Sequence, residues 1–146
     1  MEDSIRFKGE ITARLFSSDG KLKSTSFIDN AVTVYGKEGI IEQLLAVPSL
    51  HKPTHMELGT GTPTATKLGA FVASSRTAIA SKVRSGRSLV MQCTFPAGTG
   101  TGAVIEAGVF NSGVGNTEGM YCSASFNVIN KAAGDSLELT WTLTAL

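Results

Sequence analysis

The residue best placed to do chemistry is Glu106, a carboxylate within the apolar run Val104-Ile105-Glu106-Ala107-Gly108-Val109-Phe110. If this run is a strand, the Glu106 side chain has the same phase as apolar neighbours and should be buried. A buried carboxylate needs a partner because losing its hydration is costly. It could be structural, held by an arginine such as Arg76 or by backbone hydrogen bonds, or it could be a catalytic acid. Glycoside hydrolysis requires a second carboxylate beside a cleft, and no mate for Glu106 is evident, so we expect a structural buried carboxylate.

Other patterns that could support catalysis or cofactor binding are incomplete. His51 and His55 are four residues apart, but Pro53 between them breaks the helical geometry that would bring two imidazoles together. The glycine-rich loops at 59–64 and 98–102 lack the Gly-Lys-Ser or Gly-Lys-Thr of a phosphate-binding loop, and no clear helix follows either. There is also no Gly-x-Ser-x-Gly elbow for a nucleophilic serine. We expect no enzyme, no cofactor, no metal and no small-molecule substrate.

Composition limits the partners and the compartment. A net charge of +1 gives no reason to expect nucleic acid or an acidic membrane. One modest basic cluster, formed by Arg76, Lys82, Arg84 and Arg87, is expected to be a solvated hairpin rather than a binding patch. Cys93 and Cys122 lie on the apolar sides of expected strands, and the first residues lack an apolar signal core. We therefore expect free buried thiols and synthesis in a reducing cytoplasm.

The elements that position these residues are mostly strands. Residues 120–128 alternate strictly, with Met120, Cys122, Ala124, Phe126 and Val128 on one side and Tyr121 on the polar side. A period of two predicts a strand with one buried face. Similar patterns predict strands at 5–16, 21–29, 31–35, 55–58, 77–84, 88–95, 104–110 and 137–145, with Asp19-Gly20 as the turn of the first hairpin.

One segment has helical rather than strand spacing. Ile40, Ile41, Leu44 and Leu45 recur at helical intervals, and Glu38, Glu42 and Gln43 supply a polar face. This predicts one short amphipathic α-helix at about residues 37–46. The 146 residues suit one domain, 1–146, with an N-terminal arm or hairpin. The expected fold is all-β, an antiparallel β-sandwich of jelly-roll type with this one helix.

Several motifs occur together in a specific order. They are Asp19-Gly20-Lys21, Asn30-Ala31-Val32-Thr33, Met56-Glu57-Leu58-Gly59-Thr60-Gly61-Thr62, Leu68-Gly69, Arg76-Thr77-Ala78, Thr94-Phe95-Pro96-Ala97-Gly98, Ile105-Glu106-Ala107-Gly108-Val109-Phe110-Asn111 and Asp135-Ser136-Leu137-Glu138-Leu139-Thr140-Trp141-Thr142. Over nearly its whole length the chain resembles a widespread family of small tailed-bacteriophage virion proteins. The resemblance implies a structural role in the particle and no enzymatic activity.

The resemblance favours a capsid decoration, or cement, protein at the capsid surface of the virion, made in the host bacterial cytoplasm. Such a protein would bridge major capsid protein subunits and bind copies of itself as a dimer or trimer. The alternative is a tail or fibre-attachment protein with a receptor- or carbohydrate-binding role, for which Tyr121 is the one candidate exposed aromatic. The expected contact residues lie in the N-terminal arm and in two flexible loops that could order against a partner. They are Met1, Ser4, Arg6, Gly59, Thr60, Gly61, Thr62, Pro63, Pro96, Gly98 and Gly100.

Overall fold

The computed structural model describes residues 5–146, and these form one antiparallel sheet of nine strands with one short helix. The strand order is β4-β3-β7-β8-β2-β1-β9-β6-β5. The all-β antiparallel class with one helix is confirmed. The elements are β1 (Phe7–Phe16), β2 (Leu22–Val32), α1 (Val34–Glu42), β3 (His55–Gly59), β4 (Thr77–Ala78), β5 (Ser81–Ser85), β6 (Ser88–Phe95), β7 (Gly102–Phe110), β8 (Met120–Lys131) and β9 (Ser136–Ala145).

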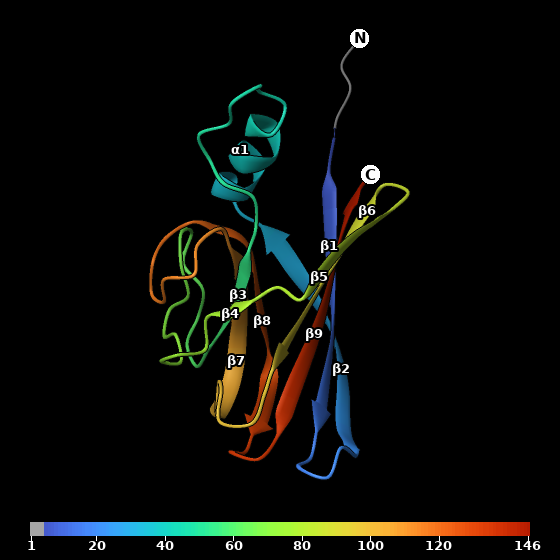
Figure 1. Cartoon of the computed structure of the whole chain (residues 1–146), viewed down its shortest axis with the longest axis vertical. Helices are drawn as coiled ribbons and strands as arrows, with labels where there is room; N and C mark the ends of the chain where they lie inside the picture. Colours follow the sequence, from blue (N-terminus) through green and yellow to red (C-terminus); the bar gives the residue numbers. More distant parts are fainter. Residues whose placement is uncertain (1–4) are drawn as a thin grey trace.

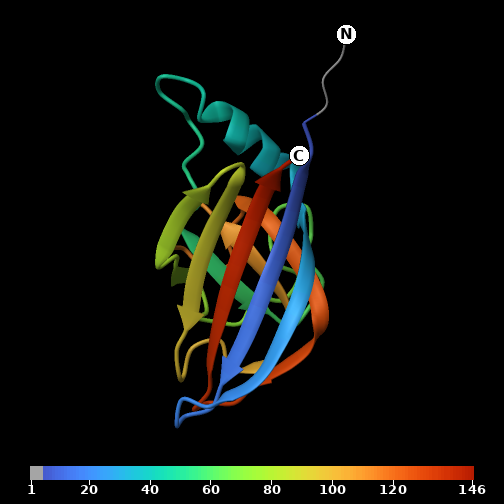
Figure 2. The ribbon, with the colours of Figure 1, turned by 90° about the vertical axis from the view of Figure 1, so that its right-hand side faces the viewer.

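The sheet curls into a half-barrel, so that its two halves face each other as the layers of a sandwich do (Figures 1 and 2). The bend is at β2, which pairs with β1 from residue 22 to residue 30 but with β8 only through Ala31 and Val32. The main core fills the space between the halves. Its largest fully buried side chains include Trp141 and Phe95 from one half and Met56 and Leu58 from the other.

The two edges of the sheet are joined by a single segment, residues 77–85. Its first part, β4, pairs with β3, and its second part, β5, pairs with β6. Between them, Ile79 N donates to Thr54 O and Ala80 N donates to Gln92 O, both at 2.8 Å. The single strand expected at 77–84 is therefore divided, because the segment changes partner as it crosses from one half of the sheet to the other.

Three other local expectations are wrong. The extended segment expected at 31–35 ends at Val32, because Thr33 caps the helix: its Oγ1 accepts a hydrogen bond from Gly36 N at 2.9 Å. Helix α1 thus begins and ends earlier than the 37–46 predicted. In β8 the register against β7 shifts between Val104 and Glu106, so Val128 is 54% exposed and Ile129 is buried in its place.

The half-barrel has two different ends (Figure 1). The helix end carries α1, Ile5 and the C-terminus, and the turn end carries the β1–β2, β6–β7 and β8–β9 connections. Two long connections, residues 60–76 and 111–119, cover the outer face of β3 and β7, and we call them the covering loops. A second, smaller core of Leu68, Phe71, Phe110 and Met120 lies beneath them. No helix within residues 5–146 is long and apolar enough to cross a membrane.

Candidate functional site

Glu106 is fully buried on β7 and is bonded to one covering loop. Its carboxylate accepts backbone hydrogen bonds from Gly61 N at 2.6 Å, Gly69 N at 2.8 Å and Ala70 N at 2.9 Å. The expected alternative, an ion pair with Arg76, is wrong. Gly59 leaves space for this carboxylate, because a Cβ at residue 59 would lie 2.5 Å from Glu106 Oε2. The Gly-Thr loop therefore wraps an anion that belongs to the protein itself.

A second buried carboxylate, Glu57 on β3, was not predicted from the sequence. Arg76 contacts it with two nitrogens, Nε to Oε2 at 3.1 Å and Nη2 to Oε1 at 3.2 Å. Arg76 also donates to Ser112 O at 2.9 Å, and its guanidinium carbon lies 3.6 Å from the centre of the Phe110 ring. The signal was present in Met56-Glu57-Leu58, where a carboxylate interrupts apolar residues much as Glu106 does.

The two carboxylates lie on the same, covered face of the sheet. Glu106 is opposite Gly59, and Glu57 has the same strand phase as Gly59. Glu106 is satisfied by three backbone donors, and Glu57 by Arg76 and by Asn116 N at 3.3 Å. Each charge is thus compensated by a covering loop, and both carboxylates fasten loops to the sheet.

The thiols and imidazoles do not form a cluster. Cys93 and Cys122 are free and buried, as predicted, and burial raises the pKa of each thiol to about 12. His51 offers its backbone carbonyl to Tyr121, whereas the His55 ring lies 2.8 Å from Thr54 Oγ1. Within residues 5–146 no group of three or more His, Cys, Asp or Glu side chains could hold a metal ion.

The predicted contact residues do not meet on one surface. Met1 and Ser4 lie outside the described residues, and Arg6 is exposed at the helix end. Thr60, Gly61, Thr62 and Pro63 belong to a covering loop, while Pro96 and Gly98 are exposed at the turn end. Gly59 and Gly100 are buried, so neither presents a contact surface.

The helix leaves two of its large apolar side chains, Val34 and Ile41, mostly in solvent. Its only buried residues are Gly36 and Gly39, and a Cβ at either position would overlap Tyr121. An amphipathic helix normally turns its large apolar residues to the core. Here the glycine side packs on β8 instead, so Ile41 is 64% and Leu44 is 83% exposed.

The helix end carries six large apolar residues that are exposed, which we call the apolar cap, and three of them, Ile5, Ile41 and Leu44, line one hollow. Every member is more than half exposed. Scattered apolar residues are normal on a protein surface, but a gathered group marks a contact site. The members are Ile5, Val34, Ile41, Leu44, Leu45 and Val47.

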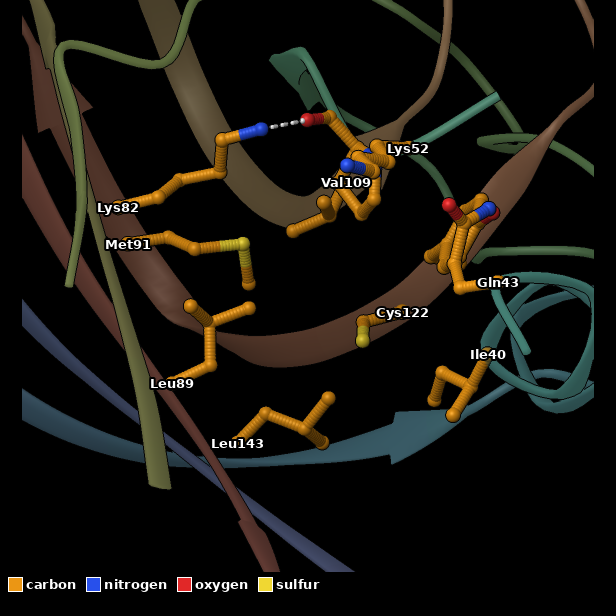
Figure 3. A pocket seen from close by; sticks show the side chains of 11 residues that line it. Ile40, Gln43, Lys52, Lys82, Leu89, Met91, Val109, Cys122 and Leu143 are labelled. Carbon is orange, nitrogen blue, oxygen red and sulfur yellow. Dashed lines mark hydrogen bonds between the residues drawn. The ribbon is translucent and has the colours of Figure 1, made fainter. Parts of the chain in front are cut away.

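Three hollows lie beside the cap, and Ile40 lines all of them. The first, of about 430 Å³, opens between α1 and strands β5, β6 and β9 (Figure 3). The second, of about 620 Å³, lies between α1 and the start of β1, and the third, of about 360 Å³, lies beside the β5–β6 turn. Every charged residue that lines them is basic: Lys52 and Lys82 in the first, Arg6 and Lys37 in the second, Arg84 and Arg87 in the third.

Tyr121 is not the exposed aromatic expected from its strand phase. It is 3% exposed and belongs to the main core, because the register of β8 against β7 shifts between Val109 and Phe110 and α1 packs against Tyr121. Its hydroxyl donates to His51 O at 2.6 Å, and its ring makes an edge contact with Tyr35. Burial raises the pKa of the Tyr121 hydroxyl.

Comparison with models of protein families, with characterised proteins and with solved structures finds no match to this chain.

Proposed function

We propose that this chain is a structural protein of a tailed-bacteriophage particle, a capsid decoration protein that binds the major capsid protein and copies of itself through the helix end. The observation that carries the proposal is the orientation of α1, which packs by glycines and leaves Ile41 in water together with Leu44 and Leu45 of the turn that follows it. The order of motifs along the chain, which resembles small virion proteins, supports a place in the particle.

Exposed apolar surface favours assembly because burying it removes it from water. Burying one valine, leucine or isoleucine side chain contributes about 1.5–3 kcal/mol, and the apolar cap offers six residues of this kind. In a symmetric particle the same small contact is repeated at every equivalent position. A subunit of this size could therefore stabilise a shell without any chemical step.

The buried carboxylates support the same proposal. Glu57 and Glu106 are occupied in attaching the covering loops, which leaves the apolar cap as the main unsatisfied feature of the described surface. The alternative, a tail protein that binds carbohydrate, loses Tyr121, which is buried, and would have to use Phe27 on β2, which is 83% exposed.

The proposal is tested by mixing the purified chain with capsids assembled from the major capsid protein of the same phage. We expect the chain to sediment with the capsids and to raise their melting temperature. The double substitution Ile41→Gln/Leu44→Gln should weaken both effects. The matched control is Phe27→Gln, since Phe27 is 83% exposed but lies on β2 outside the apolar cap. Failure of the unaltered chain to bind these capsids would overturn the proposal.

A further inference from the structure

The hollows at the helix end combine an apolar floor with charged lining residues that are all basic, while the carboxylates Glu38 and Glu42 of α1 line none of the three. In the first hollow, Leu89, Met91 and Leu143 come from β6 and β9, and Ile40 faces them from α1 (Figure 3). Lys52 and Lys82 lie at its border, and Lys82 Nζ donates to Pro53 O at 2.7 Å. This arrangement suits an occupant with an apolar side chain beside carboxylates.

The basic residues of this end have no acidic partners among the described residues. Within residues 5–146 the ion pairs are Lys8–Glu10, Lys21–Asp19, Lys23–Asp135 and Arg76–Glu57, and none includes a rim residue. The rim consists of Arg6, Lys37, Lys52, Lys82, Arg84 and Arg87. An acidic occupant would gain favourable electrostatic interactions with several of these charges at once.

We propose that the occupant is residues 1–5 of a second copy, Met1-Glu2-Asp3-Ser4-Ile5, exchanged reciprocally between two helix ends. The inference rests on the proposed function and specifies how copies join. The segment has the required chemistry: two successive carboxylates, Glu2 and Asp3, lie between the apolar residues Met1 and Ile5. Methionine is flexible and fills irregular apolar spaces.

The position of this segment agrees with exchange. Ile5 and Arg6 line the second hollow, so the segment is attached to the folded domain at the rim of the site. Four extended residues reach about 14 Å, enough to cross a close interface. Ile5 is 72% exposed on its own chain, and contact between two apolar caps would bury it.

Charge favours exchange over a simple contact between caps. In a two-fold pair the same surface meets itself, so two basic rims would repel each other. Glu2 and Asp3 from each copy would neutralise the rim of the other.

A charge-swap experiment on the full-length chain tests the inference, with sedimentation equilibrium as the measurement. The variant Glu2→Lys/Asp3→Lys should lose self-association because its arm and its rim are both basic. The variant Lys52→Glu/Lys82→Glu should lose it because its arm and the first hollow are both acidic. For each we expect at least about a tenfold fall in the association constant, or about 1.4 kcal/mol.

Mixing the two variants should restore a one-to-one dimer, because both contacts are then complementary. The control, Lys21→Glu/Lys67→Glu, has the same change in net charge as Lys52→Glu/Lys82→Glu but alters residues away from the helix end. It should associate like the unaltered chain. Circular dichroism checks that each variant is folded.

Three results would overturn the inference: an unaltered chain that stays monomeric, variants that associate normally, or a mixture that does not recover. These outcomes are independent of capsid binding. A chain that binds capsids but remains a monomer would keep the proposed function and lose this inference.

Discussion

At the scale of single residues, the protein uses buried carboxylates to hold loops in place. The Glu106 carboxylate accepts hydrogen bonds from three backbone N–H groups, all between residues 60 and 70. Leu68 and Phe71 of this covering loop pack into the smaller core, and these charge-assisted hydrogen bonds fix its glycine- and threonine-rich remainder. Glu57 and Arg76 do the same for the other covering loop, through the carbonyl of Ser112 and the backbone N–H of Asn116.

The substitution Glu106→Gln should therefore destabilise the protein. In glutamine an NH₂ group replaces one of the two carboxylate oxygens. This NH₂ group would face a backbone N–H that also needs an acceptor, so both buried donors would be left without a partner. We expect the free energy of unfolding to fall by about 1–3 kcal/mol in urea titrations. The amides of Gly61, Gly69 and Ala70 should also exchange hydrogen faster. Glu118→Gln, an exposed change in the other covering loop, serves as the control. Unchanged stability of the Glu106 variant would contradict the role given to this carboxylate.

At the scale of elements, the orientation of α1 depends on two glycines rather than on helix propensity. In an isolated helix, Gly36→Ala would stabilise by about 1 kcal/mol. In this protein a Cβ at residue 36 would overlap the carbonyl of Tyr121, which is backbone and cannot move aside cheaply. The helix would have to lift away from β8, and overpacking of this kind costs about 1–3 kcal/mol.

We therefore expect Gly36→Ala to lower the free energy of unfolding. Urea titration measures the effect, and Lys37→Ala, an exposed change at the next position of the helix, controls for propensity. A more stable Gly36→Ala variant would mean that the close contact between helix and strand does not fix the orientation of α1.

Strand periodicity predicted most of the sheet, because alternation reports directly which side of a strand is dry. It failed where a partner change or a slip interrupts alternation, as at Ile79 and at Val128. The candidate site was harder to predict. The sequence of α1 shows apolar residues at helical spacing, yet glycine contacts with Tyr121 decide which side faces inward. Such contacts depend on a strand about 85 residues away, and no local pattern reveals them.

At the scale of the whole molecule, the two ends of the half-barrel differ in how their charges are paired. At the turn end, charges are compensated. Asp135 accepts hydrogen bonds from Lys23 Nζ at 2.7 Å and Ala132 N at 2.9 Å. Lys131 Nζ, which is buried, donates to the carbonyls of Asp135 and Pro96. At the helix end, the rim charges form no ion pair within residues 5–146. Stability and association should therefore respond to different substitutions.

Asp135→Asn tests this separation of the two ends. The hydrogen bond from Lys23, with a further one from Ala132 N, holds the pKa of Asp135 below its usual value. A carboxylate with a lowered folded-state pKa stabilises the protein above its unfolded-state pKa of about 3.9, and this contribution is lost as pH falls through the folded-state pKa. The unaltered chain should thus be more stable than Asp135→Asn at neutral pH, and the difference should shrink in urea titrations repeated at acid pH.

Self-association of Asp135→Asn at neutral pH should equal that of the unaltered chain, because the substitution lies at the end away from the apolar cap. Asp29→Asn, an exposed change on β2, controls for the loss of one negative charge. If the stability difference persisted unchanged at acid pH, the ionised Asp135 would not be its source. If association fell together with stability, the turn end would contribute to the interface, and the division of roles between the two ends would be wrong.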